Sequence, residues 1–158
     1  MPQHPRLLYV VADGGSARLL ERRSSDGEFV TIRRLDGRGR LAAVREEQRD
    51  EHAGRSFESA TTARHAVGRE DDYRRAKAAF AREVAEAVNE MLAAESSSES
   101  SSGAWSGVVL AAPSRLVRVF REALEPRTNL VSTVAKDLTK TQEHELGRWL
   151  DGAERPAR

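Results

Sequence analysis

The sequence predicts an α/β fold with a mixed sheet of five strands, on three observations. Residues 7–13 form a continuous apolar run that stops at Asp13, which is typical of a central strand buried on both faces. Gly14-Gly15 follow at once and predict a tight hairpin, because glycine tolerates the positive φ that such turns need. In the second half of the chain, strand-like and helix-like runs alternate, which predicts parallel strands joined by right-handed crossovers.

The other elements follow from shorter patterns along the chain. We expect further strands at residues 16–23, 28–35, 107–112 and 130–134, and helices at 71–94, at 114–125 and after Thr139. The last helix is expected to bury Leu146, Trp149 and Leu150. A meander feeding strand–helix–strand units gives the sheet order 3-2-1-4-5 with helices on both faces, which is a ribonuclease-H-like three-layer arrangement. Residues 7–13 then lie at its centre.

The chain reads as a single domain, residues 1–158, with three irregular parts. Residues 36–70 show no sustained period, and we expect a long, polar and mobile loop there, in which residues 42–48 could make two helical turns. Residues 95–104 are a serine-rich linker, and residues 151–158 are a flexible tail. The formal net charge is only +1, so whole-molecule charge favours no class of partner.

The composition excludes several kinds of site. The absence of cysteine excludes disulfides and thiolate metal ligands. No run approaches the ~20 apolar residues that a membrane-spanning helix needs, and the N-terminus lacks a signal-peptide pattern, so we expect a cytoplasmic protein. The sequence does not determine the oligomeric state.

Residues 36–70 carry the candidate binding residues. The segment holds seven arginines and seven acids, so one interpretation is a solvated loop whose charges cancel. The other is local: Arg55, Arg64, His65 and Arg69 follow the acidic middle part, with Ser56 beside the first of them, and could hold phosphate groups. The charge pattern alone favours the first interpretation, and the length of the segment adds weight to the second, because long loops in compact domains are often functional.

A metal-dependent hydrolase is the alternative function. Asp13 ends the central strand, Asp137 follows the last strand, and Glu83 or Glu86 lies on the long helix. The strand beside the centre, however, ends without an acid, so turn and capping roles for Asp13 and Asp137 are favoured. His52 and His65 lack a third partner at ligand spacing. We therefore expect no catalytic residue, no metal and no cofactor.

Five stretches together resemble the bacterial host attachment family, "protein required for attachment to host cells". They run across nearly the whole chain, at residues 10–19, 54–59, 80–85, 109–113 and 136–139. The family is similar to the middle domain of archaeal and eukaryotic peptide-release factors, which carries a Gly-Gly-Gln loop between its third strand and its long helix. Residues 36–70 correspond to that loop and contain no Gly-Gly-Gln. The resemblance implies a non-catalytic domain that contacts the ribosome or RNA through this segment, or a role in attachment to host cells.

Overall fold

A computed structural model describes residues 5–23, 27–53, 62–96 and 103–153, with the backbone alone at 51–53, 62–67 and 96. The elements follow one another as β1 (Leu7–Ala12), β2 (Ser16–Arg22), β3 (Phe29–Asp36), α1 (Arg38–Ala53), α2 (Thr62–Ser96), β4 (Gly107–Ala111), α3 (Ser114–Ala123), β5 (Leu130–Val134), the 3₁₀-helix η1 (Glu143–Glu145) and α4 (Gly147–Leu150).

The strands form one mixed sheet in the order β3-β2-β1-β4-β5. β1 is antiparallel to β2 and parallel to β4, with Val10 opposite both Leu19 and Leu110. All six residues of β1 are buried, as a strand with neighbours on both edges and layers on both faces must be. The predicted α/β class and strand order are confirmed, and the arrangement is consistent with a ribonuclease-H-like fold.

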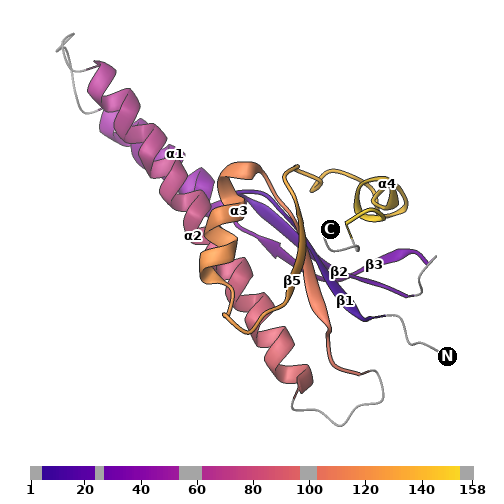
Figure 1. Ribbon diagram of the computed structural model, residues 1–158. Coiled ribbons are helices and arrows are strands. Elements are labelled where there is room, and N and C mark those ends of the chain that lie inside the picture. The colour runs from indigo at the N-terminus through magenta and orange to yellow at the C-terminus, as the bar shows by residue number, and fades with distance from the viewer. Residues whose placement is uncertain (1–4, 24–26, 54–61, 97–102, 154–158) are drawn as a thin grey trace.

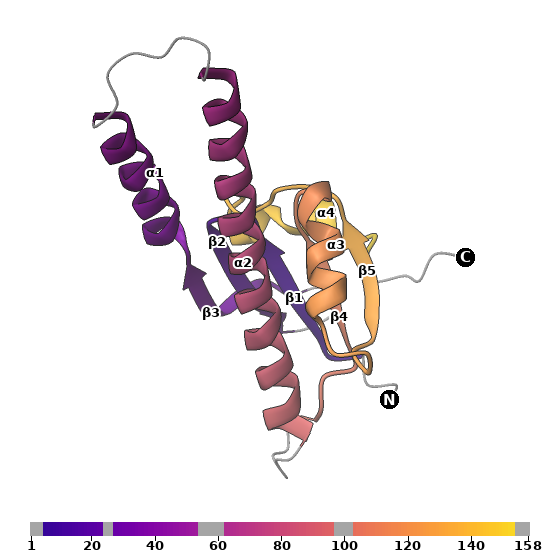
Figure 2. The same cartoon turned by 90° about the vertical axis from the view of Figure 1, so that its left-hand side faces the viewer.

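Two apolar clusters lie on opposite faces of the sheet. On one face, α2 and α3 cover the central strands, and Phe80 and Phe120 are almost fully buried against Leu8, Val10 and Leu110. On the other face, Tyr9, Val11 and Val109 meet Leu138, Leu146 and Leu150 from the C-terminal part of the chain. Figures 1 and 2 show α2 and α3 side by side over one face, with α4 on the other.

The segment 36–70 is not the irregular loop that the sequence suggested. Sixteen of its residues form α1, and α2 begins at Thr62 rather than at 71, which makes it a helix of 35 residues. Figure 2 shows α1 and the first part of α2 running side by side and projecting beyond the sheet. We call α1 and residues 62–76 of α2 the arm. The sequence did not predict the arm because α1 is mostly polar. Its half-buried apolar side chains, within the described part, are those of Leu41 and Val44.

The C-terminal part also differs from the expected long helix. Only η1 and the four-residue α4 form, and Trp149 is 43% exposed rather than buried, with the Lys136 ammonium 3.1 Å from its ring centroid. Leu146 and Leu150 are buried as expected, and Ala153 packs with them, so residues 151–153 are not part of the flexible tail that the sequence suggested. Residues 154–158 and 97–102 of the serine-rich linker lie outside the described residues.

Candidate functional site

The arm is seated on the first hairpin through three glycines. The Gly37 amide donates to the Gly15 carbonyl at 2.8 Å, which joins the start of α1 to the turn after β1. A Cβ on Gly37 would lie 2.4 Å from Cδ2 of Phe80, and one on Gly14 would lie 2.4 Å from Cγ of Lys77. Neither Gly14 nor Gly15 has the positive φ that the sequence suggested for the turn, so these two glycines and Gly37 are needed for the close approach of α1 and α2 rather than for an unusual backbone conformation.

Polar contacts join the two helices of the arm from its base outward. Arg40 forms an ion pair with Glu83 near the sheet. Further out, the Arg45 Nε donates to the Tyr73 hydroxyl, with the guanidinium carbon 5.6 Å from the ring centroid. Beyond that, Gln48 Nε2 donates to the Arg69 carbonyl at 3.2 Å. These contacts fix how the two helices lie against each other, although few apolar side chains lie between them.

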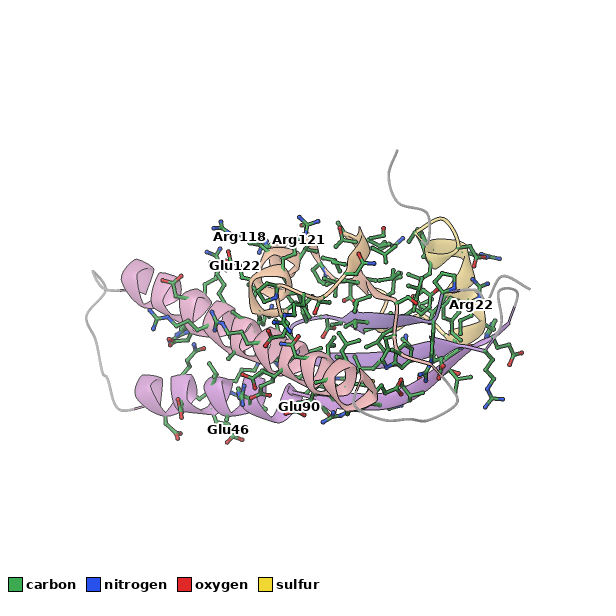
Figure 3. The ribbon with its side chains drawn as sticks, turned by 60° about the horizontal axis from the view of Figure 1, so that its bottom comes forward. Arg22, Glu46, Glu90, Arg118, Arg121 and Glu122 are labelled. Atoms are coloured by element: carbon green, nitrogen blue, oxygen red, sulfur yellow. The ribbon has the colours of Figure 1, made fainter. Side chains whose placement is uncertain are left out.

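An open hollow of about 280 Å³ lies between the helices at this level. Its walls are three arginines, an amide and a phenol ring: Arg45, Gln48, Arg49, Arg69 and Tyr73. No carboxylate lines it, and within the described part of the chain none of the three arginines forms an ion pair. Figure 3 shows Glu46, a close sequence neighbour, on the side of α1 that faces away from α2. The hollow therefore concentrates positive charge that no acid of its walls neutralises, which suits an anion.

The structure gives only part of the predicted binding cluster a place in this hollow. Arg69 lines it, as a member of the predicted set. Arg64 and His65 lie in the first turns of α2, but their side chains, like that of His52, are outside the described part. Arg55 and Ser56 lie outside the described residues altogether.

Arg45, Gln48, Arg49 and Tyr73 complete the hollow, and sequence reasoning did not single them out. One signal was present in the sequence. Arg45 and Arg49 are four residues apart, as are Arg69 and Tyr73, and on a helix that spacing places each pair on one face. The signal has this meaning only if residues 38–53 are read as a helix.

The second predicted pair, Asp13 and Asp137, does meet in space. The hydroxyl of Thr139 lies 2.6 Å from Oδ1 of Asp137 and 3.1 Å from Oδ2 of Asp13. Asp13 Oδ1 also accepts from the amides of Gly15 and Ser16, each at 2.7 Å, and Asp137 Oδ1 accepts from the Thr139 amide at 2.9 Å. Both carboxylates thus hold local turns, as aspartate commonly does. In the described ranges, no cluster of three or more His, Cys, Asp or Glu side chains stands where it could bind a metal ion.

A buried arginine holds the C-terminal segment on the other face of the sheet. Arg18 is 8% exposed, and its Nη2 donates to the carbonyls of Leu138 at 2.9 Å and Thr141 at 2.6 Å. Burial is the main cause that lowers the pKa of Arg18, and repulsion from Arg34 is the second. Nearby, the hydrogen bond from the Thr31 hydroxyl to Glu143 lowers the pKa of that carboxyl. These contacts fasten residues 138–143 to β2 and β3.

A comparison with known protein families shows to which family the chain belongs. Residues 8–150 match the family described as "Protein required for attachment to host cells". The protein belongs to this host attachment family. The match runs from β1 to α4 and so includes both helices of the arm and the Asp13 turn. Membership supports an involvement in attachment to host cells, as the family's description states. A comparison with curated proteins found no significant match. Among the described residues, no helix has both the length and the apolar character to cross a membrane.

Proposed function

We propose that this member of the host attachment family is a non-catalytic binding domain that contacts RNA, free or in the ribosome, through the arm. The observation that carries the proposal is the hollow lined by Arg45, Arg49 and Arg69, which has no carboxylate in its walls and whose arginines form no ion pair within the described residues. Guanidinium groups bind phosphate with two parallel hydrogen bonds, and RNA presents phosphates at a regular spacing.

The resemblance to the middle domain of peptide-release factors supports the same partner. That domain acts in the ribosome through the segment between its third strand and its long helix. In the present chain this segment is α1 and the start of α2, which project beyond the sheet (Figure 1). The segment has no Gly-Gly-Gln, so binding without peptide release is proposed. A cytoplasmic location is part of the proposal, and any role in attachment to host cells would then be indirect.

The test compares the parent protein with an arm variant in which Arg45, Arg49 and Arg69 are all replaced by Ala. Affinity for ribosomal RNA is measured by filter binding over a range of salt, and ribosome binding by co-sedimentation. Each lost phosphate contact removes about 0.7 to 0.9 from the slope of log affinity against log salt, so the slope should shrink by about two units or more. All three side chains lie outside the core, and among the described residues the exposed bond from Arg45 to Tyr73 is the only contact between the two helices that the structure shows them making, so the melting temperature should fall by a few degrees at most.

A control variant removes the same charge from a different surface. Arg115, Arg118 and Arg121 are exposed on α3, and Figure 3 shows the last two at the outer edge of that helix. Replacing these three by Ala should leave the salt slope within the error of the parent. If the arm and α3 variants lose affinity equally, the interaction is non-specific charge attraction. If the parent binds neither RNA nor ribosomes, the proposal is wrong.

A further inference from the structure

The hollow in the arm is small and open. At about 280 Å³ it falls just below the size of sites that enclose free small ligands, which run from about 300 to 1,000 Å³. An open hollow of this size suits one unit of a longer chain, whose neighbouring units remain outside. In an RNA-binding arm, that unit is a single nucleotide.

The walls offer two different kinds of contact. Arg49 and Arg69 supply charge, whereas Tyr73 supplies a half-buried aromatic ring that is held by the Arg45 side chain at its hydroxyl. Unpaired bases stack on aromatic rings and on guanidinium planes, while bases in a duplex already stack on one another and cannot reach such a ring. A phosphate can use only the hydroxyl of Tyr73, whereas an unpaired base can also stack on the face of its ring.

We propose that the hollow receives one unpaired nucleotide, whose base stacks on Tyr73 and whose phosphates are held by Arg49 and Arg69. This inference rests on the proposed RNA contact and specifies its substrate as single-stranded rather than duplex RNA. Arg45 acts as a positioning residue, because its bond to the Tyr73 hydroxyl fixes the ring. Gln48 already donates one amide hydrogen to the Arg69 carbonyl and keeps its side-chain oxygen for a base edge.

The experiment measures fluorescence anisotropy with a short single-stranded oligoribonucleotide and with the blunt duplex that it forms with its complement. Tyr73→Leu removes the ring, and Tyr73→Phe keeps it. The Leu variant should bind the single strand roughly 5- to 150-fold more weakly than the parent, which is the loss expected for one stacked base. Its salt slope and its affinity for the duplex should not change. The Phe variant keeps the ring and loses only the bond by which Arg45 positions it, so it should lose clearly less affinity for the single strand than the Leu variant does.

The outcomes separate this inference from the proposed function. If the parent has the same affinity for single strand and duplex, and Tyr73→Leu has the affinity of the parent for both, the inference of a stacked nucleotide is wrong. The proposed phosphate contact then still stands. If Tyr73→Phe loses as much affinity as Tyr73→Leu, the hydroxyl rather than the ring matters, and stacking is again wrong. If the parent binds neither RNA, the proposed function fails and this inference fails with it.

Discussion

Two glycines at the start of α1, only two positions apart, have opposite surroundings. A Cβ on Gly37 would lie 2.4, 2.8 and 2.9 Å from three ring carbons of Phe80, whereas a Cβ on Gly39 would meet nothing within 4 Å. Phe80 is 2% exposed in the core and has little room to move. Replacing each glycine by alanine therefore tests, with one added methyl group, how tightly the arm is seated on the sheet.

The two substitutions should change stability in opposite directions. Gly37→Ala forces a methyl group into a packed core, which typically costs about 1–3 kcal/mol. Gly39 lies inside α1 in open space, and alanine there removes the backbone entropy cost of glycine, worth about 0.5–1 kcal/mol. In a chain of this size, about 1 kcal/mol corresponds to about 2–4 °C in melting temperature. The pair should therefore differ by several degrees.

Urea unfolding followed by circular dichroism measures both variants against the parent. The midpoint should fall for Gly37→Ala and rise for Gly39→Ala, with the slope of free energy against urea unchanged in both. Equal and small effects on the midpoint would mean that Gly37 does not pack on Phe80, and the contact by which α1 is joined to α2 would then be misplaced. A loss of stability in Gly39→Ala would mean that α1 does not form where the structure has it.

Two further predictions concern the core and the C-terminal segment. Phe80→Ala should lower the free energy of unfolding by about 3–5 kcal/mol. A loss under about 1 kcal/mol in urea unfolding would contradict the burial of Phe80 between α2 and the sheet. Glu143 has a pKa below its ordinary 4.5 because the Thr31 hydroxyl bonds its charged form, so its contribution is full above that pH and disappears as the pH falls through the lowered value. Urea unfolding between about pH 6 and pH 3 should show a smaller acid loss for Glu143→Gln than for the parent, and parallel profiles would refute the coupling.

Strong local patterns predicted the sheet. The apolar run of β1, the Gly-Gly turn and the alternation of strands and helices after residue 106 each imply a single local structure, and together they imply one strand order. The apolar stripe of α2 was recognised for the same reason, since Phe80, Val84 and Val88 recur at helical spacing and are all buried.

The arm escaped prediction because its helices carry few apolar residues. Among the described side chains of α1, the apolar ones that are half-buried are Leu41 and Val44 alone, and two residues make no stripe in the sequence. Three consecutive acids from Glu70 suggested a helix start where α2 in fact continues, because acids favour the N-terminal end of a helix. Tertiary contacts hold α1 in place. They are the close packing of Gly37 on Phe80 and contacts such as the ion pair of Arg40 with Glu83, two residues that are 43 positions apart in the sequence. Trp149 was misjudged because only Leu146 and Leu150 pack on the sheet, while the Trp149 ring lies against the Lys136 ammonium at the surface.

The central claim is that RNA binds the arm between α1 and α2. Backbone amide chemical shifts of the isotope-labelled full-length protein, followed by NMR during titration with single-stranded RNA, test it without any substitution. The account predicts that shifts concentrate at residues 41–50 and 68–74, while those of α3 and α4 stay in place. Shifts centred on α3, on Trp149 or on the Asp13 turn, with the arm unchanged, would contradict it.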